Sequence, residues 1–584
     1  MLHLLGSLRS GDGDMAIEAG SLARCMQRQL SVAIQGLPQW QDAELAGMAQ
    51  RHGHAAALLE GYHRNGSKVL EILHGGFALV VQDTGKGNLA LLACDRSGIV
   101  PLFHAASGDG LVFGSRADQV AAHPGVDDAL HPQALYDYLY FHIVPGPETV
   151  FTGVQRLQPG ECLYCEENET RLDRYWVMEY DEQGLEGNPA QWRQQFLDLV
   201  RTAVQRRADD GVKVGAFLSG GTDSSTVSGM LSQLGEEPAR TYSIGFNAPG
   251  YDEMEYARLV ARHFNTEHHE YYVTAEDVVA AIPQVARQFD QPFANASAVP
   301  SYYCARMAKE DGIERLLAGD GGDELFGGNY RYAKQQMFSW YERVPRSLRR
   351  LAVEPVLLRT PLGDLGPARK LSSYIQQAVL PMPERMESYN LLDRLGPRKV
   401  LTDSALSRID TGAPMRLIRE TYHSAQTRQM LNRMLAVDMR FTLADSDLPK
   451  VTGACSMAGI EVDFPFLDDD LVAFSALLPV REKVRGTRLR HLFKEALRGF
   501  LPDEVLTKKK QGFGLPFGLW LVEHPGLREL THDSLTSLKR RDLVRPEFID
   551  ELLGRHHGEH AAYYGTMVWT LLMLEQWLAA RERP

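Results

Sequence analysis

The chain has little of what marks secreted or membrane-spanning proteins. Its six cysteines are too few and too dispersed for a disulfide framework over 584 residues, which indicates a reducing compartment: Cys25, Cys94, Cys162, Cys165, Cys304 and Cys455. No stretch approaches the ~20 apolar residues of a membrane span, and the sequence opens without the apolar core of a secretory signal. We therefore expect a soluble, cytoplasmic protein.

Positive charge is also scarce. The formal net charge is −13 and the pI is near 5.8, whereas nucleic-acid and anionic-membrane surfaces need concentrated Lys and Arg. We expect neither nucleic acid nor a membrane as partner, although a local basic patch is compatible with this composition. Cys162 and Cys165 have the spacing of a metal or redox pair, but no second pair follows, and the flanks favour an ordinary strand.

The order of sequence patterns divides the chain in two. With 44% hydrophobic residues in 584, two or more domains of about 150 residues are expected. Short apolar runs predict a strand-rich first part with two early helices, the runs lying at 73–81, 91–96 and 111–113. A polar, glycine-containing linker is predicted next. We expect one domain over residues 1–180 and a second over residues 181–584.

Strands and helices alternate after this linker. Apolar runs of strand type occur at 212–218, 241–246 and 316–318, with helical patterns between them. Such alternation predicts a parallel sheet whose ligands bind at the carboxyl ends of its strands. From about Gln335 onward the pattern is mostly that of amphipathic helices.

A glycine-rich turn, Ser219-Gly220-Gly221-Thr222-Asp223-Ser224-Ser225, follows the first of these strands and opens a helix. Backbone N–H groups at a positive helix end can surround an anion, and glycine lets phosphate oxygens approach. No Gly-Lys-Ser/Thr follows, so this is not a Walker loop. Attack at the α-phosphorus, with pyrophosphate leaving and an adenylate forming, suits such a turn, and Asp223 is placed to hold Mg²⁺. The alternative is a tight turn capped by Asp and Ser.

A second turn, residues 318–328, holds three carboxylates among five glycines: Asp320, Asp323 and Glu324. Clustered carboxylates are costly unless a cation or a substrate ammonium meets them. Because the two turns end neighbouring strands, Asp223 and Asp323 form the natural pair of magnesium ligands. The alternative is a solvated acidic turn.

A basic run, Lys508-Lys509-Lys510, precedes Gln511-Gly512-Phe513-Gly514. A lysine at this place could neutralise charge that develops on the α-phosphate or the acyl oxygen. The alternative is a solvated face, which is what a lysine triplet usually forms.

Five motifs resemble the asparagine synthetase (glutamine-hydrolysing) family in order and spacing, over nearly the whole chain: residues 219–225, Tyr251-Asp252-Glu253 with Ala257, residues 319–328, Pro465-Phe466-Leu467-Asp468, and Lys510-Gln511-Gly512-Phe513. The N-terminal part is similar to the family's glutaminase domain through Gly75-Gly76-Phe77-Ala78 and residues 95–102. The resemblance implies an α/β fold. An N-terminal nucleophile (Ntn)-hydrolase-like αββα domain would precede an ATP-pyrophosphatase (adenine nucleotide alpha hydrolase-like) parallel-sheet domain with many helices.

The resemblance also implies functional residues. ATP contacts fall on the two turns and adjoining strands: Leu218, Ser219, Gly220, Gly221, Asp223, Ser224, Ser225, Ile244, Ala318 and Gly319. Asp320 matches the acidic position beside the aspartyl-adenylate, and Lys510 the lysine that stabilises its formation, so these two are the implied catalytic residues. Glu324 falls at a substrate-side position.

Three departures from the family concern the chemistry. The family's second residue is the cysteine that attacks glutamine, whereas here it is Leu2, and the family's glutamine-binding Asn-Gly-Glu is replaced by Gln35-Gly36-Leu37. A misassigned start is a weaker explanation, because the missing binding residues are internal. Asp463 stands where relatives often carry Arg, which puts the aspartate-side pocket in doubt. We expect an inactive glutaminase domain that remains as a scaffold.

The sequence therefore predicts an ATP- and Mg²⁺-dependent ligase that adenylates aspartate or a related carboxylate and transfers it to ammonia or an amine. A homodimer is compatible with this interpretation. Two alternatives stay open at this point. One is a natural-product cyclase of the β-lactam synthetase or lasso-peptide cyclase type, and the other is a non-catalytic scaffold that has kept the fold.

Overall fold

The computed structural model describes the chain apart from residues 1–3, 10–14, 20, 26–28, 87–88, 109, 167–168, 182–183, 209–210, 236, 343, 350, 352–353, 356–365, 509–513, 559–560 and 583–584. Leu2 and Lys510, both singled out by the sequence, lie outside the described residues. None of the described helices is long and apolar enough to cross a membrane.

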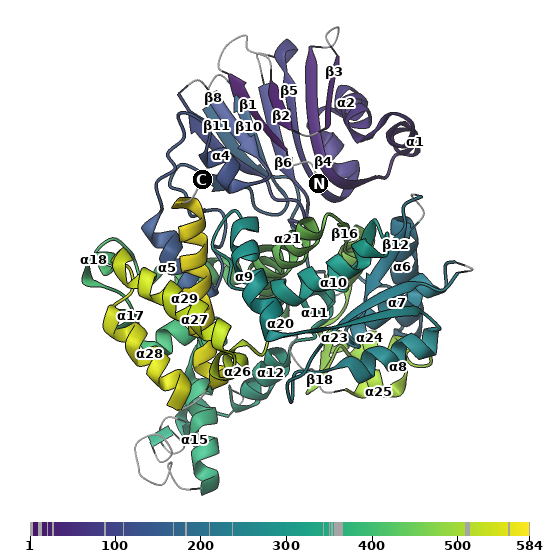
Figure 1. Cartoon of the computed structure of the whole chain (residues 1–584). Helices are drawn as coiled ribbons and strands as arrows, with labels where there is room; N and C mark the ends of the chain where they lie inside the picture. The colour runs from purple at the N-terminus through teal and green to yellow at the C-terminus, as the bar shows by residue number, and fades with distance from the viewer. Residues whose placement is uncertain are drawn as a thin grey trace.

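The N-terminal part contains two antiparallel sheets (Figure 1). One has the strand order β11 (Glu169–Arg174), β10 (Glu161–Glu166), β6 (Leu89–Cys94), β5 (Leu73–Asp83), β4 (Leu30–Trp40) and β3 (Ser21–Cys25). The other has the order β2 (Ala16–Ala19), β1 (Leu5–Arg9), β8 (Gly110–Gly114), β7 (Phe103–Ser107) and β9 (Gln155–Arg156). Cys162 and Cys165 both lie on β10, which confirms the strand interpretation.

These sheets form the two inner layers of a four-layer αββα unit. Along β5, Phe77 packs against α2 (His54–Asn65), and α1 (Ala43–His52) packs on the neighbouring β4, whereas Val80 points into the core between the sheets with Phe113. Helix α4 (Ala117–Ala121) packs on β7 and β8 of the second sheet, and α5 (Pro132–Phe141) follows it in the chain. Burial on both faces explains why β5 is a continuous apolar run, since successive side chains point to opposite faces.

A parallel sheet forms the centre of the second part. Its strand order is β14 (Glu267–Val273), β13 (Arg240–Phe246), β12 (Val214–Phe217), β15 (Arg315–Leu317) and β16 (Glu461–Asp463). The chain runs outward from β12 through β13 to β14 and then returns to place β15 on the other side of β12. The crevice between the ends of β12 and β15 is therefore the topological switch point, where ligands of such sheets bind.

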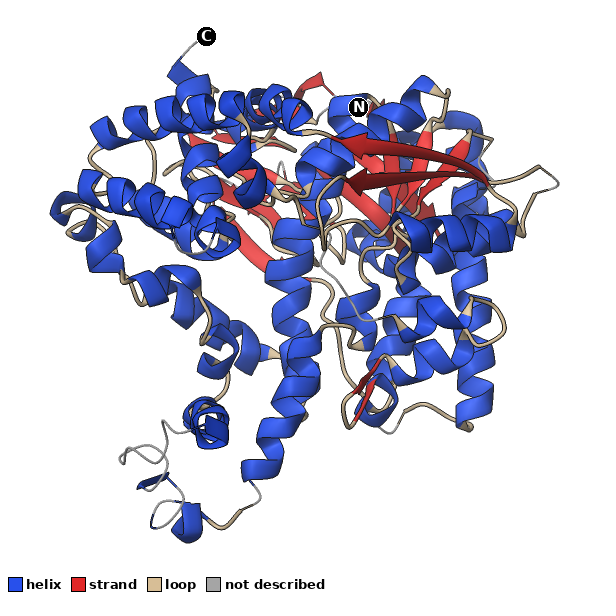
Figure 2. Ribbon diagram, turned by 60° about the horizontal axis from the view of Figure 1, so that its bottom comes forward, coloured by secondary structure: helices blue, strands red, loops and turns tan. Residues whose placement is uncertain are grey.

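Helices surround this sheet and make up most of the rest (Figure 2). Those near the sheet are α6 (Pro189–Ala208), α7 (Thr222–Ser232), α8 (Met254–Phe264), α9 (Ala275–Gln288), α10 (Ala298–Glu310) and α11 (Gly322–Phe326). The later ones are α12 (Tyr330–Glu342), α13 (Arg346–Leu348), α15 (Gly366–Val379), α16 (Leu391–Leu395), α17 (Pro397–Val400), α18 (Asp403–Leu406), α19 (Ala413–Ser424), α20 (Met430–Asp438), a π-helix η7 (Met439–Asp447), α21 (Leu448–Ala458), α22 (Asp469–Leu477), α23 (Val480–Lys483), α24 (His491–Ala496), α25 (Asp503–Thr507), α26 (Phe517–Glu523), α27 (Pro525–Leu538), α28 (Pro546–Gly558) and α29 (Ala561–Glu582). The sequence pattern did not indicate β14 or β16.

Buried ion pairs join the N-terminal unit to the rest. Arg156 and Asp445 pair at 2.8 Å between Nη1 and Oδ1, with both side chains buried. Asp469, in the first turn of α22, accepts from Arg96 Nη1 at 3.0 Å and from the Gly75 backbone N–H at 3.1 Å. The start of β5 is thus bonded to a carboxylate of the second part. The predicted boundary at 180/181 lies between β11 and α6 and stays a prediction.

Candidate active site

The first glycine turn joins β12 to α7. Ser219 is bonded to Ser224 in two ways: its backbone N–H donates to Oγ at 3.1 Å, and the two hydroxyls are 2.9 Å apart. Gly220 has φ +68°, and a Cβ there would lie 2.6 Å from the Ala257 backbone nitrogen. Only glycine therefore allows the turn to pack against the start of α8.

The start of α7 has features of an anion site. Gly221 is its N-cap and supplies no side-chain cap, so the first N–H groups of the helix are open to a ligand. Ser225 is fully buried, and its hydroxyl oxygen has no hydrogen-bond partner among the described residues. Buried polar atoms are normally satisfied, so an orphan hydroxyl in this turn fits a bound phosphate group.

The second turn packs directly on the first. A Cβ on Gly319 would lie 2.7 Å from the Ser224 backbone nitrogen, and one on Gly322 would lie 2.3 Å from Asp223 Oδ1. Gly321, at φ +98°, takes a conformation that other residues rarely adopt. The glycines at these positions therefore allow the acidic turn to reach Asp223.

Asp223 and Asp323 converge on one guanidinium group, that of Arg490. Arg490 forms a bidentate pair with Asp223, at 2.7 Å from Nη1 and 2.6 Å from Nη2, and also pairs with Asp323. Its side chain is only 5% exposed, so these charges interact with little screening by water. The sequence analysis missed Arg490, which precedes α24 at φ +52° and carries no motif of its own.

Asp320 lies beside a second buried cation that the sequence analysis missed. Lys450 Nζ, on α21, is 3.4 Å from Asp320 Oδ1 and 2.9 Å from Asp447 Oδ1. Burial lowers the pKa of Lys450, but Asp447 and Asp320 outweigh it and raise the pKa above its ordinary value. Burial raises the pKa of Asp320. Lys450 is therefore a permanent positive charge next to the predicted catalytic carboxylate.

Glu324, in the same acidic turn as Asp320, is buried. Burial, and after it the charge of Asp323, raises its pKa well above the ordinary range. Nearby, Asp438 accepts from Arg331 and from the Tyr332 hydroxyl. Glu324 therefore lies buried in a region where several carboxyl groups act on one another.

Lys508 differs from the solvated lysine that its triplet indicates. Its side chain is 8% exposed, and Nζ lies 2.9 Å from Glu253 Oε1 and 3.4 Å from the Gly220 carbonyl oxygen. The ammonium also lies 4.3 Å from the centre of the Tyr256 ring. The expectation of a solvated face is thus wrong for Lys508, which contacts the glycine turn itself.

The predicted adenosine contacts also come together. A small cavity of about 10 Å³ is lined by Leu218, Ser219, Ser243, Ile244, Tyr251, Glu253, Met254 and Ala257. Its members come from the ends of β12 and β13 and from the start of α8. The motif at 251–257 therefore borders the same space as Leu218 and Ile244, although it is distant from Leu218 in sequence.

Asp463, the residue that departs from the family pattern, has a partner of opposite charge. Its Oδ1 lies 3.0 Å from Nε of Arg207, which is 1% exposed and also pairs with Asp468 at 3.0 Å. The Asp463 carbonyl accepts from the Ala318 N–H at 2.9 Å. Asp463 thus has a structural role next to the acidic turn.

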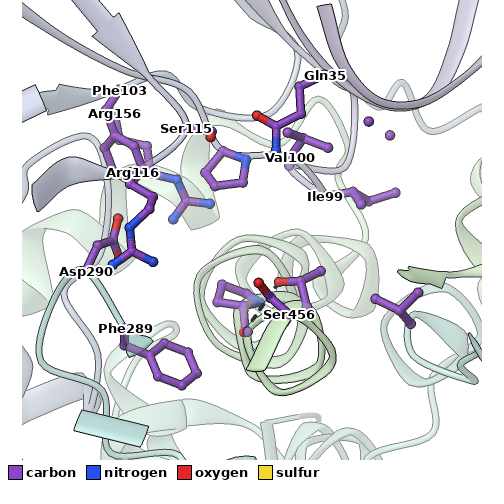
Figure 3. A pocket seen from close by; sticks show the side chains of 18 of the residues that line it. Gln35, Ile99, Val100, Phe103, Ser115, Arg116, Arg156, Phe289, Asp290 and Ser456 are labelled. Atoms are coloured by element: carbon purple, nitrogen blue, oxygen red, sulfur yellow. Dashed lines mark hydrogen bonds between the residues drawn. The ribbon is translucent and has the colours of Figure 1, made fainter. Parts of the chain in front are cut away.

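The residues at the predicted glutaminase position border a larger space, which we call the central chamber (Figure 3). It has a volume of about 500 Å³ and lies between β4 and β5 of the N-terminal unit and α21 and β16 of the second part. Gln35 Oε1 accepts from the Leu4 N–H at 2.7 Å, and Leu37 is one of the lining residues. Asp95 accepts hydrogen bonds from the N–H groups of Ser97, Ile99 and Val100, which fixes the conformation of the turn at residues 96–100.

A phosphate-type glycine turn and an acidic turn at one switch point, joined to an αββα unit, define a nucleotide-using enzyme with an amidotransferase-type unit. A family model described as asparagine synthase matches residues 195–579, and one described as a glutamine amidotransferase domain matches residues 44–176. The first model covers more than half of the chain. The chain therefore belongs to the asparagine synthase family. The Ntn-type and parallel-sheet architecture that the sequence predicted is thereby confirmed.

Named relatives agree with this family. A Mycobacterium tuberculosis protein, provisionally named a glutamine-hydrolysing asparagine synthetase, is 29% identical over 551 residues, covering 90% of this chain and 80% of its own. The Bacillus subtilis protein named asparagine synthetase [glutamine-hydrolyzing] 1 is 24% identical over 531 residues, covering 89% and 80%. The chain is an ATP-dependent amide ligase of the asparagine synthetase type, which makes it a carbon–nitrogen ligase.

Proposed function

We propose that the enzyme adenylates a small carboxylate, aspartate or a related acid, and transfers the acyl group to ammonia or an amine that does not come from glutamine. A carboxylate oxygen attacks the α-phosphorus of ATP, the α–β phosphoanhydride bond breaks, and pyrophosphate leaves. The amine nitrogen then attacks the acyl carbon, AMP leaves with the electrons of the C–O bond, and the nitrogen loses a proton.

The observation that carries this proposal is the convergence of two turns at the ends of β12 and β15. The open start of α7 and the orphan Ser225 hydroxyl suit phosphate groups, and Leu218 and Ile244 border a space beside them. Pyrophosphate and the adenylate would thus lie where the acidic turn meets the first turn. This supports the ten ATP-contacting residues that the resemblance implies.

Asp223 and Asp323 would hold magnesium. Among the described residues no group of three or more His, Cys, Asp and Glu side chains forms a ready metal site, and Mg²⁺ usually takes only one or two carboxylates besides substrate phosphates. Hard carboxylate oxygens that already converge on one cation, Arg490, fit that donor set. When bound, the metal would neutralise phosphate charge.

The substrate side is assigned to Asp320, Glu324 and Lys510. Asp320 lies in the acidic turn, two residues after Ala318. Its carboxylate is paired with Lys450 and so has a fixed position. Lys510 is proposed, from its motif alone, to stabilise charge that develops on the phosphate or acyl oxygen. Glu324 is buried, and its burial raises its pKa, which favours a role in hydrogen bonding over one in charge pairing.

The lining of the central chamber supports a nitrogen source other than glutamine. No cysteine lines it in the part of the chain that the structure describes, and the aliphatic Leu37 lines it. An aliphatic side chain supplies neither a nucleophile for an amide nor a partner for a ligand ammonium. The hydrogen bonds of Gly75 with Asp469 and of Ile99 with Asp95 order the backbone of this region, and they need neither a nucleophile nor an ammonium-binding group.

Exchange of labelled pyrophosphate into ATP tests the proposal. The purified chain is incubated with ATP, Mg²⁺ and one carboxylate at a time, beginning with L-aspartate, and exchange without carboxylate is the blank. We expect exchange above the blank for at least one acid and, when ammonium is added, an amide product. A chain that exchanges with none of the acids, yet binds ATP, would contradict adenylation.

A further inference from the structure

The central chamber is much larger than ammonia requires. Its volume is about 500 Å³, whereas a water-sized molecule takes about 30 Å³ of liquid volume. Sites for small organic ligands range from about 300 to 1,000 Å³. The chamber therefore has the size of a binding site for an organic molecule.

Its walls are mainly apolar. Side chains from both parts of the enzyme contribute, among them Ile34, Leu37, Val100, Ile143, Phe289 and Phe293. Glycines at several other lining positions leave the backbone without a side chain and so widen the space. A ligand with an apolar body fits such walls, because burial of apolar surface is the main source of affinity.

Most charged groups that line the chamber already have a partner of opposite charge. Arg156 pairs with Asp445, Glu461 with Arg315 at 2.9 Å, and Asp463 with Arg207. Their charges cancel locally. They do not select the charge of a ligand.

Asp290 is the exception within the described residues. Its Oδ2 accepts only from the Ala117 backbone N–H, at 2.7 Å, and it forms no ion pair. Figure 3 shows it beside Arg116, but that guanidinium is engaged by both oxygens of Asp118, at 2.9 and 2.6 Å. Burial raises the pKa of Asp290, as expected for a carboxylate without its own cation. The charges of Arg116 and Arg156 also act on Asp290, but neither guanidinium forms an ion pair with its carboxylate within the described residues.

The chamber also adjoins the ligase site. Pro449, Thr452 and Ser456 on α21 line it, while Lys450 on the same helix contacts Asp320. One helix therefore separates the chamber from the carboxylate assigned to the acyl-adenylate.

We propose that the central chamber binds a primary amine with an apolar body, its ammonium group at Asp290 and its body against Val100, Phe289 and Phe293. This inference rests on the proposed function, in which an amine takes the place of glutamine-derived ammonia. The amine held at Asp290 would have to leave the ion pair and give up a proton before its nitrogen could attack the acyl carbon. The chamber would then have exchanged a glutamine site for an acceptor site within the same scaffold.

Direct binding to the full chain tests this without any turnover. Calorimetry compares n-pentylamine with n-pentanol and pentanoate, which share its length but not its charge. We expect the amine to bind the wild type at least about tenfold more tightly than the alcohol, because it gains an ion pair. Pentanoate should bind most weakly.

Two variants locate the site. Asp290→Asn should bring the amine to within about threefold of the alcohol and leave the alcohol unchanged. Asp118→Asn should also weaken amine binding, because it frees Arg116 to pair with Asp290. Asp470→Asn removes an exposed carboxylate that does not line the chamber, so it is the control, and amine binding should change by less than about threefold. Val100→Phe should weaken amine and alcohol alike, and Val100→Ala should not.

Equal binding of amine and alcohol to the wild type, no binding of either, or no effect of Asp290→Asn would each overturn the inference. Pyrophosphate exchange without added amine is run on the same preparations. Exchange together with failed amine binding contradicts the acceptor site alone, whereas amine binding without exchange contradicts the proposed adenylation.

Discussion

The two ligand-binding regions of this enzyme differ in what they have kept. Around the central chamber, Gly75 of β5 is bonded to Asp469, Asp95 orders the turn that follows it, and the aliphatic Leu37 is one of the lining residues. At the switch point, the glycine turns and the chemical groups remain together, with Asp223 and Asp323 on a shared cation. The comparison shows that backbone geometry and reactive side chains can vary independently, because they depend on different residues.

The largest effect is expected at the paired carboxylates. Asp223→Asn or Asp323→Asn should reduce pyrophosphate exchange by at least about 1,000-fold, since each removes a magnesium ligand and an Arg490 partner. Asp470→Asn, which removes an exposed carboxylate paired with Arg206, is the control and should keep near wild-type activity. Residual exchange in Asp223→Asn comparable to this control would refute the metal assignment.

Lys510 and Lys508 should affect different kinetic parameters. Lys510→Ala should lower kcat by about 100-fold or more with little change in KM for ATP, because it acts in the transition state. Lys508→Ala should mainly raise KM for ATP, by about tenfold, because Lys508 contacts Glu253 and the Gly220 carbonyl in the resting enzyme.

Lys509→Ala is the control in this series, and we expect it to leave kcat and KM for ATP close to the wild-type values. If Lys510→Ala changes only KM for ATP, Lys510 is a binding residue and its catalytic role is wrong. Unchanged kinetics in Lys508→Ala would instead show that its contacts with the turn are dispensable.

The smallest effect is one on stability in the N-terminal scaffold. Burial raises the pKa of Asp137 on α5 to about 6, from an ordinary value of 3.8. A raised pKa stabilises the folded state below the unfolded pKa, and that stability is lost as pH rises through about 6, on the order of 2–3 kcal/mol. Asp137→Asn, which keeps the oxygen that accepts from Gln133, should therefore raise the melting temperature at pH 7.5 by about 2 °C.

The same melting curves at pH 4 provide the internal control. There the wild-type carboxyl group is protonated, so the two proteins should melt within about 1 °C of each other. A gain of equal size at both values of pH would show that the charge of Asp137 is not its cause.

Sequence patterns predicted the strand-rich first part, the parallel sheet and the two turns, because periodicity and glycine-rich segments are local signals. The αββα layers were implied by the family resemblance. The patterns missed β16 and β14: the first is only three residues long, and the second, Glu267–Val273, has a polar pattern. Arg490 and Lys450 were missed for a different reason. They reach the acidic turn from distant segments, and a lone arginine or lysine carries no signal of the fold that brings it there.

For Lys508 a sequence signal was present, but it was misleading. Its triplet is typical of a solvated face, yet packing of α25 places Lys508 against α8 and the first turn. The metal, nucleotide and catalytic roles stay predictions, since the arrangement of the described residues supports them without a ligand in place.

Release of glutamate from glutamine tests the central claim most directly. Purified wild-type chain is incubated with ATP, Mg²⁺ and the carboxylate that supports exchange, with either L-glutamine or ammonium as nitrogen source, and Leu2→Cys is run beside it. The account predicts amide formation with ammonium, no glutamate above the no-enzyme rate, and no glutaminase gain in Leu2→Cys, because Leu37 still leaves a glutamine ammonium unpaired. Glutamate formation by the wild type, in proportion to the amount of enzyme, would contradict it and make the chain an ordinary glutamine-dependent synthetase.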